Sequence, residues 1–201
     1  MSQSHTLQEA KAQLREEARK RRSLIDEQRR AAASAEISRR AIALVSSLDV
    51  EVIAGYFAVR GEVDPRGILA WAERSGIACA LPSVHSGYSL VFRQYRGDDP
   101  LVAGSFGVPS PTHDAREVTP DLLNVPLLAF DRRGTRLGYG RGFYDRGIAR
   151  LREHGVDLRL LGVAFAGQEV PEVPAEPHDV RLDWIVTEKE TIDLRVATTK
   201  G

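Results

Sequence analysis

Four glycines and five arginines gather in one short stretch of the chain, residues 130–146, which reads FDRRGTRLGYGRGFYDR. Glycines allow backbone N–H groups to surround an anion without a side chain in the way. Arginine guanidinium groups match phosphate oxygens two hydrogen bonds at a time. The stretch therefore predicts a polyphosphate-binding loop. Its glycines and arginines are Gly134, Gly138, Gly140, Gly142, Arg132, Arg133, Arg136, Arg141 and Arg146.

The glycines alone leave two interpretations open. The pattern matches neither the Walker A loop nor the dinucleotide fingerprint, and glycine-rich turns also arise for steric reasons. Asp145, just after the last glycine, favours the phosphate interpretation. A carboxylate beside an anion requires a cation between them, and Mg²⁺ takes one or two carboxylates together with substrate phosphates. The alternative for Asp145 is an acid in the first turn of a helix, stabilised by the helix dipole.

The elements on either side place this loop between a strand and a helix. The apolar run 127–130 predicts a buried strand. Residues 143–152 predict a helix, with Phe143, Ile148 and Leu151 on its inner face. The N-terminus of that helix would add unpaired N–H groups and partial positive charge to the loop.

Across the chain, predicted strands alternate with predicted helices. We expect helices at 7–22, 26–48, 64–74 and 143–152, and strands at 50–59, 77–81, 88–95, 125–130, 158–165 and 182–187. The strand at 88–95 is expected to be half-exposed and antiparallel. Residues 96–123 are expected to be mostly loop with a helical turn at 119–121, and no element is expected after 188. This alternation predicts one α/β domain over 1–201, with a largely parallel sheet covered on both faces. Ligands in such folds bind beyond the carboxyl ends of the strands.

Composition narrows the class of protein. The 201 residues carry 28 Lys and Arg against 28 Asp and Glu, so no overall field attracts nucleic acid or anionic membrane. The apolar stretches are too short for a membrane span. Cys79 is the single cysteine, which excludes an intrachain disulfide and indicates a reducing compartment. With a polar N-terminus unlike a signal peptide, these features lead us to expect a cytoplasmic protein.

The first predicted helix carries a basic stripe. Its residues Lys11, Arg15, Arg19 and Arg22 are four, four and three positions apart, which places them on one face. Glutamates share the helix, so we interpret most of this charge as solvated. The alternative is a basic arm that reaches a phosphate or RNA, although nucleic-acid affinity requires several phosphates to be neutralised together.

Three carboxylates outside the glycine loop also attract interest. Asp64 precedes Pro65 and is explained as a helix cap. Glu62 has no such structural duty, which makes it a candidate for binding. Asp179 lies in a proline-containing loop and either supplies a second carboxylate to a cation or forms a turn. The histidines lack metal-ligand spacing, and the sequence contains no G-x-S-x-G elbow.

Taken together, five segments resemble the 5-formyltetrahydrofolate cyclo-ligase (5,10-methenyltetrahydrofolate synthetase) family, and they span most of the chain. The glycine segment at 128–146, with its trailing Tyr144-Asp145, is highly specific, and the other segments agree with it in order and spacing. These other segments are KAQLR at 11–15, RGEVD at 60–64, FGVPSP at 106–111, and EPHD at 176–179 followed by LDWIVT at 182–187.

The resemblance implies an activity and a fold. The reaction would convert 5-formyltetrahydrofolate and MgATP to 5,10-methenyltetrahydrofolate, ADP and phosphate. The formyl oxygen would attack the γ-phosphoryl group, and N10 would then close the ring as phosphate leaves. The fold would be a single three-layer α/β/α domain with a mostly parallel, Rossmann-like sheet. The helical arm would span 7–48, and the partners would be small molecules bound by a monomer, not nucleic acid or membrane.

The resemblance also implies site residues, with Lys11 and Arg141 as the catalytic cations. ATP would be bound by Lys11, Arg15, Arg136, Leu137, Gly138, Tyr139, Gly140, Arg141, Gly142, Phe143 and Tyr144. The folate would be bound by Phe57, Glu62, Tyr139, Gly140, Arg141, Gly142 and Phe143. Mg²⁺ would be held by Asp145 and Asp179.

Two other functions compete with the ligase. One is a nucleic-acid-binding accessory protein that uses the arginine-rich helix and loop. The other is a relative that binds a folate or a phosphorylated metabolite without catalysis. The presence of Lys11, Glu62, Arg141 and Asp145 together favours the enzyme.

Overall fold

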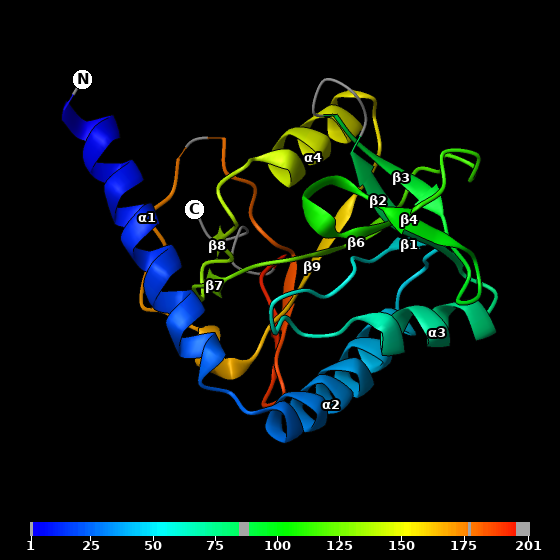
Figure 1. Cartoon of the computed structure of the whole chain (residues 1–201), viewed down its shortest axis with the longest axis horizontal. Coiled ribbons are helices and arrows are strands. Elements are labelled where there is room, and N and C mark those ends of the chain that lie inside the picture. Colours follow the sequence, from blue (N-terminus) through cyan, green and yellow to red (C-terminus); the bar gives the residue numbers. More distant parts are fainter. Residues whose placement is uncertain (1, 85–88, 177, 196–201) are drawn as a thin grey trace.

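A seven-stranded sheet forms the centre of the molecule, whose computed structural model describes residues 2–84, 89–176 and 178–195 (Figure 1). The strand order is β11-β10-β9-β6-β1-β2-β3. The five inner strands run parallel, and β3 and β11 add antiparallel edges. The strands of this sheet are β1 (Val52–Ala54), β2 (Ala78–Val84), β3 (Leu90–Gln94), β6 (Leu122–Val125), β9 (Arg159–Val163), β10 (Trp184–Val186) and β11 (Thr191–Asp193).

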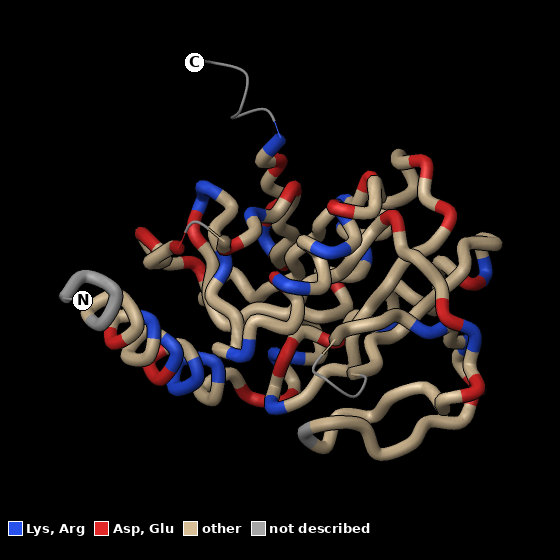
Figure 2. Tube along the Cα trace, turned by 90° about the horizontal axis from the view of Figure 1, so that it is seen from above, with Lys and Arg blue, Asp and Glu red and all other residues tan. Residues whose placement is uncertain are grey.

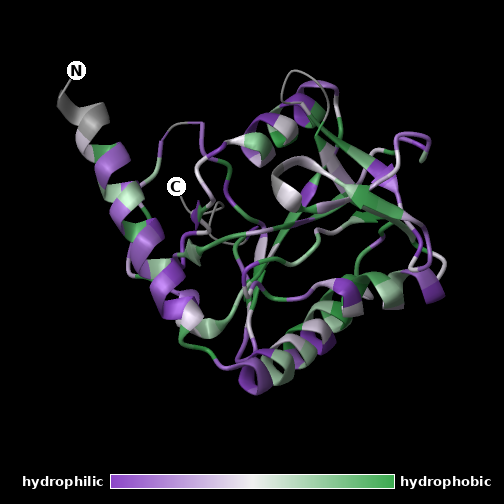
Figure 3. Ribbon diagram, viewed as in Figure 1, coloured by the Kyte–Doolittle hydropathy of each residue, from purple (hydrophilic) through white to green (hydrophobic). Residues whose placement is uncertain are grey.

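Helices cover both faces of the sheet, which confirms the predicted α/β architecture. Helices α2 (Glu27–Val45) and α3 (Arg66–Arg74) lie against one face (Figure 1), where Ile37 and Ile68 join a core with Trp184. Helix α4 (Phe143–Glu153) lies on the other face, where Ile148 packs with Phe92 and Leu160. The strands are apolar and the outer sides of the helices polar (Figure 3), as two-sided burial requires.

Local chemistry explains where these helices begin. Asp26 caps α2, since its carboxylate accepts the N–H of Arg29 at 2.8 Å. The carboxylate of Asp64 accepts the N–H of Arg66 at 3.0 Å, and α3 starts at Arg66, one residue after the proline expected to open it. Gly142, with φ of 64°, precedes α4.

Helix α1 (Ser2–Ser23) stands apart from the sheet (Figure 1). It packs on a small hairpin of β7 (Ala129–Phe130) and β8 (Arg136–Leu137) and on the 3₁₀ turn η2 (Ala166–Gln168). Ala18 joins Leu128, Leu137 and Val173 in a third, smaller core. Because this apolar contact is narrow, the position of α1 depends strongly on its polar contacts.

Several predicted elements differ in the structure. The strand expected at 50–59 is confined to β1, and the strand expected at 125–130 divides into β6 and β7, with Pro126 directly after β6. The helical turn expected at 119–121 is wrong: the carboxylate of Asp121 instead accepts the N–H groups of Glu51 and Val52, at the start of β1. Strand β3 is antiparallel as predicted, but it is buried rather than half-exposed because α4 packs on it. Tyr88, the first residue of that prediction, lies outside the described residues.

Two regions predicted to lack regular structure contain strands. Strands β4 (Leu101–Ala103) and β5 (Pro109–Pro111) form a hairpin around the 3₁₀ turn η1 (Ser105–Gly107). Strand β11 extends the sheet beyond residue 188. Within the described part of the chain, every helix is too short or too polar to cross a membrane.

Candidate functional site

A cavity of about 850 Å³ opens at the carboxyl ends of β1 and β2 and beside the loop that follows β8. Its walls come from α1, the segment 56–62 after β1, the β4–β5 hairpin, residues 136–146 and the loop around 176–179. Ligands in α/β folds bind at this end of the strands because backbone groups and helix N-termini converge there. The glycine loop therefore lies where the sequence predicted a ligand site.

Backbone geometry explains two of the glycines. Gly140 and Gly142 have φ of 89° and 64°, a region that other residues rarely adopt. A Cβ on Gly140 would also lie 3.1 Å from the guanidinium carbon of Arg15. The glycines thus let the loop turn sharply and let α1 approach its backbone.

Asp131 anchors the base of this loop although its side chain is fully buried. Its carboxylate accepts the N–H groups of Arg133 at 2.9 Å, Thr135 at 3.1 Å and Val173 at 3.0 Å. Burial alone would raise the pKa of Asp131, but these hydrogen bonds and the Arg133 guanidinium outweigh burial and lower the pKa. An ionised carboxylate thus ties the β7–β8 hairpin to the segment that leads toward residue 176.

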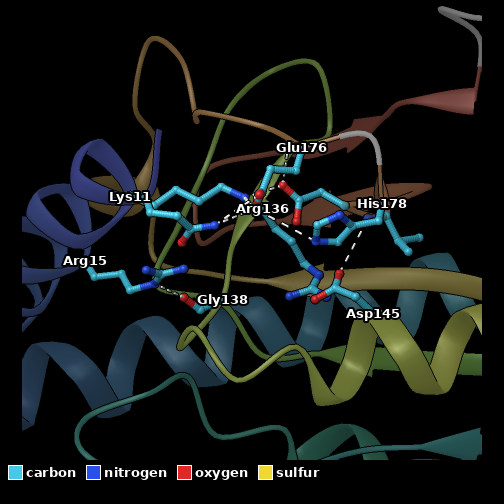
Figure 4. A network of polar contacts seen from close by, with 10 residues as sticks. Lys11, Arg15, Arg136, Gly138, Asp145, Glu176 and His178 are labelled. Atoms are coloured by element: carbon cyan, nitrogen blue, oxygen red, sulfur yellow. Dashed lines mark hydrogen bonds and ion pairs between the residues drawn. The ribbon is translucent and has the colours of Figure 1, made fainter. Parts of the chain in front are cut away.

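Lys11 and Arg15 reach from α1 into the cavity (Figure 4). The buried Nζ of Lys11 lies 2.6 Å from the carboxylate of Asp179 and 2.7 Å from that of Glu176. Arg15 Nε donates to the carbonyl of Gly138 at 3.0 Å. Burial would raise the pKa of Asp179, but hydrogen bonds from Lys11 and from the Glu176 N–H outweigh burial and lower the pKa. The lowered pKa keeps the Asp179 carboxylate ionised at neutral pH.

Arg136 forms the second ion pair of the site. Its guanidinium lies 2.6 Å from the carboxylate of Asp145, and its side chain is almost completely buried (Figure 4). Arg136 Nε is buried and has no hydrogen-bond partner among the described residues. The hydrogen bonds described for Asp145 join it to Arg136 and to the N–H of Val180, not to amides of α4. The positive charge next to Asp145 in this structure is thus the Arg136 guanidinium.

The donor atoms that could hold a metal ion cluster at Asp179. Atoms of Glu176, His178 and Asp179 lie within 4.8 Å of one another. The spacing of the histidines did not predict His178 as a metal ligand. Asp145 is not in this group, although it lines the same cavity and bonds to the residue after Asp179. Carboxylate oxygens suit Mg²⁺, so this donor set fits the expected ion.

Glu62 lies on the other side of the glycine loop, in a buried position. It accepts a short hydrogen bond from the hydroxyl of Tyr139 and one of 2.8 Å from the N–H of Val59. Burial raises the pKa of Glu62, while the Tyr139 hydrogen bond opposes this effect. Burial also raises the pKa of the Tyr139 hydroxyl, which stays protonated as a donor. Phe57 lines the cavity beside them, with the Arg66 guanidinium 5.8 Å from its ring centre.

Every residue that the sequence assigned to the site lies in the wall of this one cavity. The side chain of Leu137 is buried in the small core under α1, so only its backbone is available to a ligand. Arg141 is exposed on the cavity rim. The structure thus brings Lys11, Glu62 and Asp179 together from distant parts of the chain.

Sequence reasoning missed several features of the site. The β4–β5 hairpin forms a wall that was expected to be loop. The interpretation of the α1 stripe as solvated charge is wrong for Lys11 and Arg22, which are buried. The available signal was the spacing of Lys11, Arg15 and Arg22 with Ala18, which marks one helix face. Both charge signs occur along α1, and basic residues gather in its last turn (Figure 2).

Known proteins resemble this chain in sequence over most of its length. The sequence model of the 5-formyltetrahydrofolate cyclo-ligase family matches residues 7–188. The chain is 31% identical over 178 residues to the 5-formyltetrahydrofolate cyclo-ligase of Haemophilus influenzae, covering 85% of this chain and 93% of that protein. It is 33% identical over 141 residues to the Escherichia coli enzyme of the same name, covering 67% and 76%.

A solved structure has the same fold. The Aquifex aeolicus 5,10-methenyltetrahydrofolate synthetase superposes with a TM-score of 0.80 at 29% identity, covering 92% of this chain and 93% of that chain. By sequence and by fold, the chain belongs to the 5-formyltetrahydrofolate cyclo-ligase family.

Proposed function

We propose that the cavity at the carboxyl ends of the sheet is the active site, with MgATP and the folate bound side by side. Family membership defines the reaction, the conversion of 5-formyltetrahydrofolate to 5,10-methenyltetrahydrofolate, and implies the use of ATP. The observation that carries the proposal is the position of the glycine loop, between the cations of α1 and the Glu62 carboxylate. A volume of about 850 Å³ is within the upper range of small-molecule sites.

The ATP phosphates would bind between α1 and the glycine loop. Lys11, Arg15, Arg136 and Arg141 line this part of the cavity and would pair with phosphate oxygens. The loop from Arg136 to Tyr144 would contribute backbone N–H groups, since Gly140 and Gly142 leave them uncovered. The unpartnered Nε of buried Arg136 supports this assignment, because a phosphate oxygen would supply the missing acceptor.

Mg²⁺ would bind at Asp145 and Asp179, next to the phosphates. Glu176 and His178 lie beside Asp179 and complete a set of donors suited to the ion. When bound, Mg²⁺ would neutralise charge on the phosphate oxygens. Lys11 and Arg136 now pair with these carboxylates, so binding of MgATP would let both cations turn to the phosphates.

The folate would occupy the side of the cavity lined by Phe57 and Glu62. The carboxylate of Glu62 would accept hydrogen bonds from the pterin, and the Phe57 ring would contact its face. Tyr139 would lie between the two substrates, because its hydroxyl bonds to Glu62 while its backbone belongs to the glycine loop. This arrangement would hold the formyl group next to the terminal phosphate.

The chain's residues would act by positioning and by charge. The formyl oxygen attacks the γ-phosphorus as the bond to the ADP oxygen breaks. N10 then attacks the formyl carbon, loses its proton, and phosphate leaves with the former formyl oxygen. Lys11 and Arg141 would stabilise the charge on the transferred phosphoryl group. Orientation and preorganised charge supply most of the rate in such transfers.

The decisive experiment follows methenyl absorbance with purified chain, 5-formyltetrahydrofolate and MgATP, and measures ADP in parallel. We expect product only with ATP, and one ADP per ring closed. Glu62→Gln should raise the folate KM about tenfold or more, with little change in the ATP KM. Glu153→Gln, at an exposed site on α4, is the matched control. A larger effect on the ATP KM would place Glu62 elsewhere and contradict the folate assignment.

We also propose that the chain acts as a monomeric, single-domain, cytoplasmic enzyme. All the residues assigned to the site line this cavity, so the proposed reaction needs no residue from a second copy. Cys79 is the single cysteine, so no intrachain disulfide can form, which supports a reducing compartment. Sedimentation at micromolar concentration tests the oligomeric state.

A further inference from the structure

Arg22 is a buried arginine at the C-terminal end of α1, with 3% of its surface exposed. Its guanidinium donates to the hydroxyl of Tyr139 at 2.9 Å and to the carbonyl of Arg60 at 3.1 Å. It also lies over the Tyr139 ring, 5.8 Å from the ring centre. Burying an arginine is costly unless its donors are satisfied, so these contacts fix its position.

The contact with Tyr139 sets the direction of a hydrogen-bond relay. A guanidinium group can only donate, so the Tyr139 hydroxyl accepts from Arg22. The hydroxyl proton is then free to bond the carboxylate of Glu62, which accepts it. The relay therefore runs from Arg22 through Tyr139 to Glu62.

The contact with Arg60 acts on the backbone that carries Glu62. Arg60 and Gly61 have φ of 52° and 76°, and this left-handed conformation is unfavourable for an arginine. The turn is closed by the Glu62 N–H, which donates to the carbonyl of Val59 at 3.1 Å. Arg22 thus holds both the turn before Glu62 and the hydroxyl in front of it.

We propose that Arg22 is a positioning residue for the folate site, which holds the Tyr139 hydroxyl and the 60–61 turn so that Glu62 presents an ionised carboxylate to the substrate. This inference rests on the proposed role of Glu62 in folate binding. It gives α1 a second function, because the helix that carries Lys11 and Arg15 to the phosphates also organises the folate side.

The charges around Glu62 define the expected pH effect. Burial raises the pKa of Glu62, while the Tyr139 hydrogen bond and the charges of Arg22 and Arg60 lower it. Two further tyrosines, Tyr56 and Tyr144, interact electrostatically with the same carboxylate, and the Arg30 guanidinium lies beside Gly61. Loss of the Arg22 charge would move the Glu62 pKa further upward. The acid limb of kcat/KM for the folate should then move to higher pH.

The test compares Arg22→Met with Arg21→Met, a matched control at an exposed position of the same turn. For Arg22→Met we expect a folate KM about tenfold higher, an unchanged ATP KM, and an acid limb moved to higher pH. Arg22→Lys keeps the charge, so its pH profile should lie close to that of the unchanged chain. Its folate KM should be lower than that of Arg22→Met but higher than that of the unchanged chain. A thermal melt of each variant verifies folding.

Tyr139→Phe tests the same relay without touching α1, and it decides the matter if Arg22→Met does not fold. Tyr139→Phe should also raise the folate KM and move the acid limb of the pH profile to higher pH. The inference is overturned if the folate KM and the pH profile stay unchanged, or if the folate and ATP KM values rise equally. Glu62→Gln separates the proposed role of Glu62 from the proposed role of Arg22. If the folate KM of Glu62→Gln is unchanged, Glu62 itself does not bind the folate.

Discussion

Lys11 and Asp179 are joined by an ion pair of 2.6 Å between the first helix and the loop before the last parallel strand. A second pair of 2.6 Å joins Arg136 to Asp145 across the glycine loop. In each pair, the cation is a proposed phosphate ligand and the carboxylate a proposed Mg²⁺ ligand. Each cation therefore neutralises the carboxylate beside it, and MgATP would bind by exchanging these partners.

Replacing Lys11 should weaken ATP binding. Lys11→Met removes one charge-assisted bond to a phosphate, which is worth about 1.5–3 kcal/mol, so the ATP KM should rise about 10- to 100-fold. Steady-state kinetics at saturating folate measures the effect. Lys20→Met, on an exposed part of the same helix, should leave the ATP KM unchanged. Equal ATP KM values for the two variants would remove Lys11 from the nucleotide site.

Replacing Asp145 should change the dependence on Mg²⁺. Asp145→Asn removes one carboxylate charge from the proposed ion site. The Mg²⁺ concentration that gives half-maximal turnover should therefore rise about tenfold or more. A magnesium titration of turnover measures this, with Asp157→Asn as the exposed control. If the titration curve does not move while the protein unfolds at lower temperature, Asp145 acts only by holding Arg136 and Val180.

Replacing Arg141 tests the rim of the glycine loop. Arg141→Ala should cost about 1.5–3 kcal/mol in kcat/KM for ATP, because a guanidinium would be lost from the transferred phosphoryl group. Arg74→Ala, exposed on α3, serves as the control. Since Arg141 is exposed, its loss should leave the melting temperature almost unchanged. Kinetics equal to those of the control would exclude Arg141 from the reaction.

Asp131 gives a pH-dependent prediction about stability. The pKa of Asp131 is lowered in the folded chain. The contribution of its carboxylate to the free energy of unfolding is therefore fully present above the pKa in the unfolded chain, which is about 3.9. That contribution is lost as the pH falls through the folded pKa. Asp131→Asn should lower the free energy of unfolding by about 3 kcal/mol at pH 7.

The difference between Asp131→Asn and the unchanged chain should shrink as the pH is lowered toward 3. Urea unfolding at several pH values measures it, and Asp49→Asn provides an exposed control. A difference that stays constant with pH would show that the charge of Asp131 does not matter.

The sequence alone determined the architecture and the main loop. Alternating apolar runs and capped helices predicted the parallel sheet, because the period of apolar residues reflects which faces are buried. Gly140, Gly142 and the neighbouring arginines predicted the anion site, since glycines expose backbone N–H groups and arginines bind phosphate oxygens. Glu62 was singled out as a carboxylate without a structural duty, and Asp179 as a second carboxylate for a cation, with a turn as the alternative.

Tertiary structure decided which charges meet. Arg22 read as solvated because its local neighbours are polar, yet it is buried by Tyr139 and by the turn at Arg60. The spacing of residues along the chain could not place Lys11 against Asp179, 168 positions away. Hairpin β4–β5 and strand β11 were missed because short strands are specified by the partner they pair with rather than by their own residues. Local sequence fixes periodicity and turns, whereas contacts between distant segments depend on the packing of the whole chain.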